Sequence, residues 1–275
     1  MKICEEQNKI IVTEVSDFLL SETLLCGQCF RFRQEDGIFK GAVGKHICRV
    51  SQEGDSLIFY GTEKEVVEKV FIPFFDLDAD YSYLRDLYSK DETLKKAMDF
   101  CFGIRILRQD AFEALITFII SQNNNIKRIG GIVERFCQMF GEHLGEGIYS
   151  FPTPEMLRGV TIEELSPLRA GFRDKYLLDA FDKVLSGDVD LKAIKKMPTE
   201  KAIEELMKIK GVGLKVASCV ALFGLYKTDA FPIDVWIKRV LETYYPSGFP
   251  LEFYETRGIA QQFLFHYIRT LEERE

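Results

Sequence analysis

The stretch Glu204–Cys219, EELMKIKGVGLKVASC, decides the fold of this chain. One helical pattern runs into Gly211-Val212-Gly213, and a second leaves it at once. Glycines let the backbone turn tightly and approach a ligand closely. The second helix begins with free N–H groups and the positive end of the helix dipole, a natural seat for a phosphate. The stretch therefore predicts a helix-hairpin-helix, at about residues 204–226, that grips the DNA backbone without reading sequence.

Lys215 lies in the first turn of that second helix. A cation there opposes the helix dipole, so its position disfavours the ammonium form and favours the neutral, nucleophilic amine. Lysines tuned in this way form Schiff bases. The alternative is a solvated lysine that touches a phosphate, which taken alone is the commoner role.

A carboxylate follows in Phe231–Trp236, FPIDVW. Asp234 precedes another helical pattern, so the simplest expectation is an N-cap. A catalytic role requires the carboxylate to face the cleft beside Lys215. There it would stabilise a cationic sugar transition state.

Around this region the chain divides into two parts. Mixed apolar and polar segments separated by Gly and Asp predict strands at 10–13, 30–34, 38–43, 46–50 and 56–60, with an Asp36-Gly37 hairpin. Helical patterns are predicted at 63–70 and, after about residue 80, at 126–140, 154–158, 175–186, 199–208, 214–225, 234–244 and 255–273. We expect an α+β fold: a small antiparallel β-sheet domain at 1–80, then a larger helical domain at 81–275.

The charge distribution permits DNA binding although the chain is acidic. The 275 residues carry a net charge of −7, but what matters is where the charge lies. Residues 51–100 hold 12 acidic and 6 basic side chains, whereas residues 201–240 hold 4 acidic and 7 basic ones. The acidity therefore lies mostly away from the predicted hairpin.

Seven scattered cysteines fit a reducing compartment better than a disulfide scaffold. Cys26 and Cys29 have the spacing of half a zinc site, but no second pair or histidine cluster completes it, so we expect no metal. No apolar run is long enough to span a membrane, and the N-terminus lacks a signal-peptide core. We expect an intracellular protein, in the cytoplasm or nucleoid if prokaryotic.

The hairpin with its lysine, followed about twenty residues later by Pro-x-Asp, resembles the helix-hairpin-helix DNA glycosylase superfamily. Three further segments are similar to the 8-oxoguanine DNA glycosylases in particular: Gly27–Arg31 (GQCFR), Ser121–Arg128 (SQNNNIKR) and Gly171–Tyr176 (GFRDKY). They occur in the family order and span nearly the whole chain. The resemblance implies a sheet domain and two helical lobes around a cleft. It also implies a monomer that binds double-stranded DNA containing oxidised guanine and needs no cofactor.

By this resemblance, Lys215 attacks C1′ of a flipped nucleotide and Asp234 supports departure of the base. β-Elimination from the Schiff base would then nick the strand. The Gly27 carbonyl would accept from N7–H of 8-oxoguanine, a position where guanine has only a lone pair. Cys219 and Phe265 would contact the two faces of the base, and Gln261 its polar edge. Taken alone, Cys219 and Phe265 would be ordinary core residues.

The same resemblance implies an opposite-base reader made of Asn123, Arg128 and Arg173. Two guanidinium groups would satisfy the N3 and O2 acceptors of cytosine, whereas adenine presents a donor there. Phe172 would fill the vacated stack. The alternatives are a polar loop for Asn123 and solvated surface for the two arginines.

One position departs from the family. Trp236 stands where better-known eukaryotic members carry a histidine that contacts a phosphate; its indole N–H or its ring face would make this contact with the DNA backbone, beside Gly211, Val212 and Gly213. Endonuclease III and the adenine glycosylases carry an iron–sulfur site, but no cysteine follows Cys219. Alkylpurine glycosylases usually lack the lysine. The remaining alternatives are a non-enzymatic hairpin DNA-binding protein and, more remotely, a helical protein that does not bind DNA.

Overall fold

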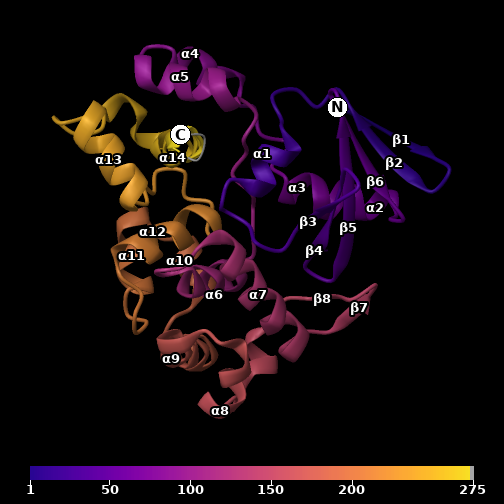
Figure 1. Cartoon of the computed structure of the whole chain (residues 1–275), viewed down its shortest axis with the longest axis vertical. Helices are drawn as coiled ribbons and strands as arrows, with labels where there is room; N and C mark the ends of the chain where they lie inside the picture. The colour runs from indigo at the N-terminus through magenta and orange to yellow at the C-terminus, as the bar shows by residue number, and fades with distance from the viewer. Residues whose placement is uncertain (273–275) are drawn as a thin grey trace.

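The computed structural model describes residues 1–272 and shows an antiparallel sheet followed by a helical region (Figure 1). The sheet has the strand order β1-β2-β6-β5-β4-β3, with antiparallel neighbours throughout. Its strands are β1 (Lys2–Glu6), β2 (Lys9–Thr13), β3 (Arg33–Glu35), β4 (Ile38–Val43), β5 (His46–Glu53) and β6 (Ser56–Tyr60). The predicted α+β class is confirmed.

The predicted hairpin between β3 and β4 is present. Asp36 and Gly37 both have positive φ, +50° and +80°, as a tight two-residue turn requires. The strand predicted at 30–34 is wrong at its start, because pairing begins only at Arg33. Tertiary contacts hold the preceding residues out of the sheet: Arg31 donates to the Tyr149 carbonyl, and the Phe32 ring stacks on Phe74. Strand β1 was not predicted.

Helices supply most of the remaining chain. A short helix, α1 (Leu20–Leu25), interrupts the sheet between β2 and β3. After the sheet come α2 (Lys64–Val66), a π-turn (Val67–Phe71), α3 (Ile72–Phe74), α4 (Ser82–Tyr88), α5 (Glu92–Cys101), α6 (Ala111–Ser121), α7 (Ile126–Phe140), α8 (Ile162–Leu165), α9 (Asp174–Ser186), α10 (Leu191–Lys195), α11 (Thr199–Leu206), α12 (Leu214–Phe223), α13 (Val235–Tyr244) and α14 (Arg257–Glu272). Four 3₁₀ turns lie at Pro154–Leu157, Ser166–Leu168, Gly171–Arg173 and Leu251–Thr256.

A two-stranded ribbon stands inside the helical region. It is formed by β7 (His143–Gly145) and β8 (Ile148–Tyr149), which were not predicted. Gly145 and Gly147 both have positive φ, so the turn depends on residues without a Cβ. The ribbon follows α7 and lies close to β4 of the large sheet (Figure 1).

Two hydrophobic cores underlie this architecture. The first lies beneath the sheet and runs from Ile10 to Leu77, with Leu107 added from farther along the chain. The second fills the helical region from Tyr81 onward and also takes in Cys26. The segment around α1 therefore packs into both cores. We propose that the boundary between the two domains lies at residue 80. Within residues 1–272, no helix combines the length and apolar composition that crossing a bilayer requires.

Candidate active site

The hairpin has the geometry that its glycines predict. Gly211 has φ +79°, and a Cβ built on it would lie 2.3 Å from the Tyr176 ring, so only glycine fits there. Gly213 caps α12 with extended backbone and faces open space. The first peptide N–H groups of α12 thus remain accessible to an anion.

Lys215 is half-buried in the first turn of α12. Its Nζ lies 5.8 Å from the centroid of the Phe118 ring, which belongs to α6. Cys219 follows one turn later and is only 3% exposed. Burial raises the pKa of the Cys219 thiol; the Lys215 ammonium opposes this rise, and the Asp234 carboxylate adds to it.

Asp234 is the N-cap of α13, as its simplest interpretation predicts. Its Oδ1 accepts from the backbone N–H groups of Trp236 and Ile237 at 3.0 and 2.9 Å. Both cap bonds go to one oxygen, which leaves Oδ2 outside the cap. Capping and a role beside the amine are therefore compatible in one carboxylate.

Gly27 and Phe265 meet although they are 238 positions apart in the chain. Gly27 has φ +86°, and a Cβ there would lie 3.5 Å from Cε1 of Phe265 and 3.7 Å from Cδ1 of Ile126. One turn before Phe265 on α14, the Gln261 side chain is 4% exposed, and its Oε1 has no hydrogen-bond partner among residues 1–272. A buried acceptor without a partner costs free energy, so a ligand that donates to it would be favoured.

Aromatic contacts connect this pocket to the amine. The Phe118 ring beneath Lys215 packs edge-on against Phe30 at 6.5 Å, in the segment that carries Gly27. Helix α14 also approaches α12 closely, because a Cβ on Gly258 would lie 2.6 Å from Cδ1 of Leu222. The structure thus brings three distant segments of the sequence to one place.

The two reader arginines differ in their surroundings. Arg173 is 3% exposed, and its guanidinium donates to the carbonyls of Gln122, Asn123 and Ala170. Burial lowers its pKa, and Arg128 lowers it further. Arg128 is exposed and makes one long contact, 3.5 Å, to the Arg169 carbonyl. Solvated surface, the alternative for both, describes Arg128 and not Arg173.

Phe172 has the exposure that a wedge needs. Its ring is 51% exposed and lies 4.4 Å from the Arg173 guanidinium. Asn123, also exposed, has φ +46°, which places it at a sharp turn before α7. Trp236 is half-buried, with its ring 5.1 Å from the Arg239 guanidinium. These positions place the side chains without assigning their ligands.

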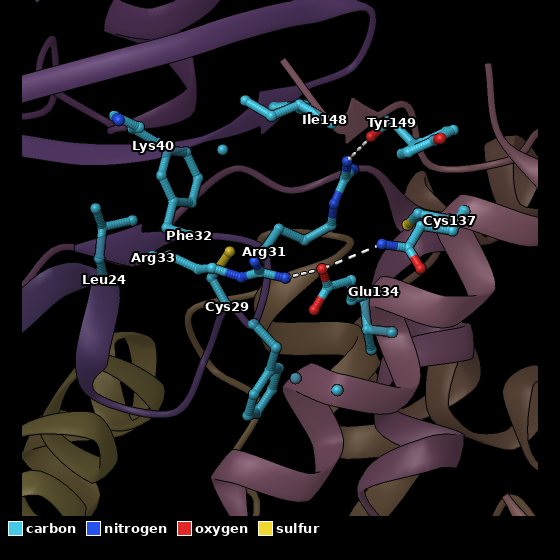
Figure 2. A pocket seen from close by; sticks show the side chains of 18 of the residues that line it. Leu24, Cys29, Arg31, Phe32, Arg33, Lys40, Glu134, Cys137, Ile148 and Tyr149 are labelled. Atoms are coloured by element: carbon cyan, nitrogen blue, oxygen red, sulfur yellow. Dashed lines mark hydrogen bonds and ion pairs between the residues drawn. The ribbon is translucent and has the colours of Figure 1, made fainter. Parts of the chain in front are cut away.

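A cleft of about 600 Å³ lies elsewhere, between the sheet, α7 and the β7–β8 ribbon (Figure 2). Charged groups such as Arg31, Lys40 and Glu134 line it. Neither Lys215 nor Asp234 does. The chemistry of the amine and the carboxylate, and not cavity size, therefore identifies the candidate site.

Among residues 1–272, no group of three or more potential ligands could hold a metal ion. Cys26 and Cys29 are free, buried thiols. Burial raises their pKa to about 11 and about 12, respectively, which keeps both protonated. Protonated thiols are poor metal ligands.

Sequence reasoning missed several residues around the site. Gln28 is completely buried, and its side-chain amide bonds to backbone groups of Thr23, Arg105 and Leu107. Gln262 donates to the Cys26 carbonyl from α14 at 2.9 Å. Glutamine is usually exposed, so nothing in the local pattern marks Gln262, and the Gly27–Arg31 motif assigned no role to its glutamine.

Comparison with known proteins gives a consistent result. Residues 10–115 match the family profile of the 8-oxoguanine DNA glycosylase N-terminal domain. Residues 116–248 match that of the HhH-GPD superfamily base excision DNA repair proteins. The Arabidopsis thaliana N-glycosylase/DNA lyase OGG1 is 30% identical over 83% of this chain and 67% of its own length.

Solved structures agree over almost the full length. MBOgg1, in complex with a low-affinity DNA ligand, is 40% identical and covers 98% of this chain and 99% of its own, with a TM-score of 0.92. The Clostridium acetobutylicum 8-oxoguanine glycosylase/lyase was solved with double-stranded DNA containing cytosine opposite 8-oxoG. It is 37% identical, covers 99% of both chains and also has a TM-score of 0.92.

Proposed function

This chain belongs to the 8-oxoguanine DNA glycosylase family, and we propose that it excises 8-oxoguanine from duplex DNA and then cleaves the strand as a lyase. The observation that carries the proposal is the half-buried Lys215 amine in the first turn after the hairpin, 5.8 Å from the centroid of the Phe118 ring, in a chain that also places the Asp234 carboxylate at the start of α13. A protein that only grips DNA needs neither group there. We further propose that it acts inside the cell, in the cytoplasm or nucleoid if the cell is prokaryotic.

The proposed reaction begins at C1′ of the flipped nucleotide. The Lys215 amine forms a bond to C1′ as the N-glycosidic bond breaks; its nitrogen gives up a proton, and the base departs with the bonding electrons and takes up a proton. Positive charge develops on the sugar during this step, and the Asp234 carboxylate stabilises it. Opening of the sugar ring at the C1′–O4′ bond of this N,O-acetal yields a Schiff base between Nζ and C1′. Loss of a C2′ proton then expels the 3′ phosphate, and water releases the sugar fragment from the lysine.

The proposed base pocket lies between Gly27 on one side and Gln261 with Phe265 on the other. The Gly27 carbonyl would accept from N7–H, which guanine lacks. The buried Oε1 of Gln261, without a partner in the free protein, would accept from an N–H on the polar edge of the base. Cys219 and Phe265 would enclose the ring.

The proposed opposite-base reader uses Arg128 as the mobile donor. The Arg173 guanidinium already donates to three carbonyls, so only its remaining N–H groups would be able to donate to the opposite base. Phe172, exposed beside it, would enter the vacated stack. We infer a preference for cytosine, since its N3 and O2 both accept.

The test is incubation with duplexes that carry 8-oxoguanine, uracil, 3-methyladenine or no lesion, with strand cleavage followed on a denaturing gel. Cleavage of the 8-oxoguanine duplex alone, together with borohydride-trapped protein–DNA adduct, is the expected result. Cleavage of another duplex in its place would assign a different substrate. Binding without cleavage of any duplex would leave a non-enzymatic hairpin protein.

A further inference from the structure

We propose that Gln262 is a positioning residue that sets the direction of the Gly27 carbonyl and thereby determines selectivity for oxidised guanine. This inference rests on the proposed function, because it concerns how the same base pocket is held. Its starting point is the segment between α1 and β3, which no regular hydrogen-bond ladder supports.

Glycine cannot fix its own peptide orientation. Without a Cβ, Gly27 has access to many backbone conformations, and its φ of +86° is one that other residues rarely adopt. A carbonyl that must accept from one particular N–H needs a fixed direction, since a hydrogen bond weakens steeply as its angle departs from linearity. Neighbouring groups must therefore supply the restraint.

The carbonyls on either side of Gly27 are both held by side-chain amides. Gln262 Nε2 donates to the Cys26 carbonyl at 2.9 Å, and Gln109 Nε2 donates to the Gln28 carbonyl at 2.8 Å. All of these glutamines are less than 9% exposed. Fixing the peptide oxygens before and after Gly27 leaves its own carbonyl little freedom.

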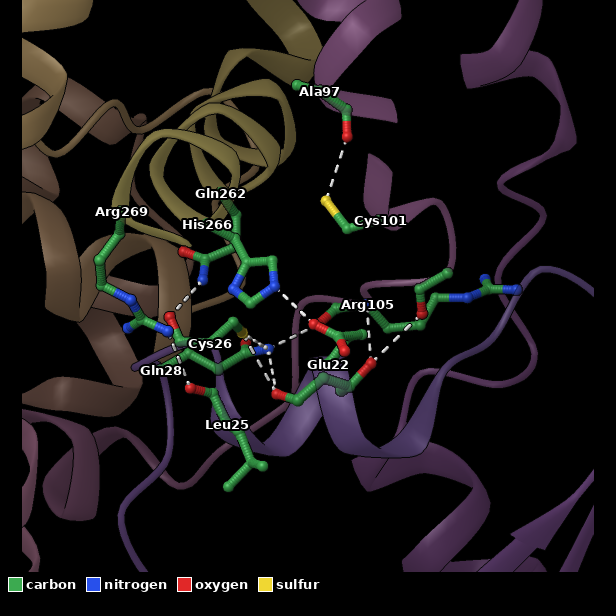
Figure 3. Close-up of polar contacts among 12 residues, drawn as sticks. Glu22, Leu25, Cys26, Gln28, Ala97, Cys101, Arg105, Gln262, His266 and Arg269 are labelled. Carbon is green, nitrogen blue, oxygen red and sulfur yellow. Dashed lines mark hydrogen bonds and ion pairs between the residues drawn. The ribbon is translucent and has the colours of Figure 1, made fainter. Parts of the chain in front are cut away.

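Helix α14 also fastens α1 and the turn through two further side chains on the same face as Gln262 (Figure 3). His266 Nε2 lies 2.5 Å from an oxygen of Glu22, and Arg269 donates to the Leu25 carbonyl at 3.3 Å. Residues at positions i, i+4 and i+7 of a helix share a face. One face of α14 therefore grips the segment that leads into Gly27.

The adjacent face of α14 carries the rest of the base pocket. Gln261 precedes Gln262 by one position, and Phe265 lies next to Gly27. A single rigid helix thus holds both the acceptor for the polar edge of the base and, through Gln262, the acceptor for N7–H. Helix α14 therefore sets the distance between the two acceptors. A base without the N7 hydrogen cannot move toward the Gln261 oxygen to compensate for the hydrogen bond that it fails to make to the Gly27 carbonyl.

Gln262→Met tests this proposal, because methionine keeps the volume and removes the donor. Single-turnover excision of 8-oxoguanine opposite cytosine should fall by about tenfold or more, the scale expected for a misplaced recognition group. Lyase cleavage of a duplex with a preformed abasic site should stay within about twofold of wild type. That second substrate contains no base, so it does not depend on the Gly27 carbonyl.

Tyr88→Phe is the matched control. It also deletes one buried side-chain donor to a backbone carbonyl, that of Thr256 just before α14, but it lies away from the turn. Both activities of this variant should remain near wild type even if its melting temperature falls as far as that of Gln262→Met.

Normal excision by Gln262→Met, or an equal loss of excision and abasic-site cleavage, would overturn the positioning role while leaving the proposed function intact. If the wild type itself fails to excise 8-oxoguanine, the proposed function and this inference fail together. The wild-type lane therefore distinguishes the two failures.

Discussion

Lys215 has an aromatic ring at one side and a buried thiol one turn away. Phe118 lies 5.8 Å from Nζ, and Cys219 is 3% exposed. Asp234 is tied by two backbone hydrogen bonds, so its position needs no reorganisation when charge develops. The two proposed roles can be tested separately, because Lys215 would form the covalent bond and Asp234 would stabilise the developing positive charge.

Lys215→Gln should bind duplex DNA but lose base removal and borohydride cross-linking, because it deletes the nucleophilic amine. The measurement is trapping of protein on an 8-oxoguanine duplex, with binding checked by gel shift. Lys208→Gln is the control, since Lys208 lies in the same hairpin region and pairs with Glu205. Wild-type cross-linking by Lys215→Gln would rule out the assigned nucleophile.

Asp234→Asn should keep the fold, because asparagine also caps helices, with a change in unfolding free energy within about 1 kcal/mol. Excision should fall by about a hundredfold or more through loss of the negative charge. Single-turnover kinetics and a urea melt give the two quantities. Asp110→Asn makes the equivalent change at the N-cap of α6 and should leave excision unaffected. Equal activity of Asp234→Asn and wild type would reduce Asp234 to a cap.

At the scale of elements, the hairpin and the reader turn are each built by a pair of segments that hold one another. Tyr176, from α9, closes against Gly211, so α9 supports the hairpin directly. Arg173, just before α9, holds the turn after α6 through the carbonyls of Gln122 and Asn123. Residues 173–176 therefore position both the hairpin and the turn after α6, the two loops that we propose to face DNA.

The two hairpin glycines should respond differently to alanine. Gly211→Ala should destabilise the protein by about 1–3 kcal/mol, because its Cβ overlaps the Tyr176 ring and its φ is positive. Gly213→Ala meets no neighbour and should fold normally, but its methyl group stands where a phosphate would approach, so it should weaken duplex binding. Thermal melts and salt-titrated binding separate the two. A stable Gly211→Ala variant would contradict the packing argument.

Arg128→Ala should narrow the gap between cytosine- and adenine-paired substrates by about ten- to a hundredfold, while slowing cleavage of the cytosine pair less. Arg128 is exposed and makes one weak contact, so stability should barely change. Arg173→Ala, in contrast, should lower stability because it strips donors from buried carbonyls. The assay is single-turnover cleavage opposite each of the four bases. Equal wild-type rates opposite cytosine and adenine would refute the reader.

Over the whole molecule, one buried ion pair and one half-exposed ion pair connect the sheet domain to the helical region. Arg31, just before β3, pairs with Glu113 of α6 at 3.3 Å, with side chains only 6% and 13% exposed. Arg108 reaches the fully buried Asp76 at 2.6 Å, and Tyr226, just after α12, donates to the same carboxylate. The proposed base pocket lies between parts of the chain that these contacts hold together.

Glu113→Ala should cost about 3–5 kcal/mol, because it leaves the Arg31 charge buried without its partner. The double replacement Arg31→Met with Glu113→Leu should recover much of that loss, since no unpaired charge remains. Denaturant melts give the values. Glu272→Ala breaks the exposed pair with Arg239 and should have little effect. If the double variant were no more stable than Glu113→Ala, the unpaired Arg31 charge would not be the cause of the lost stability.

The sequence by itself determined the order of most elements and the hairpin, and it supplied the amine and the carboxylate that we propose as catalytic groups. These depend on local physics: helical periodicity, glycine at a tight turn, a cap before a helix. The strand expected at Phe30 shows the limit of local reasoning, since Arg31 and Phe32 are drawn out of the sheet by Tyr149 and Phe74.

Only the tertiary structure decided which side chains hold the proposed base pocket and the turn beside it. Gln262 and Cys26 are 236 positions apart, so no periodicity links them, and a glutamine reads as surface until its partner is known. The same holds for Arg173, whose burial depends on carbonyls of a loop fifty residues earlier in the chain. A side chain's role follows from what it touches, and contacts between distant segments exist only once the two cores have packed.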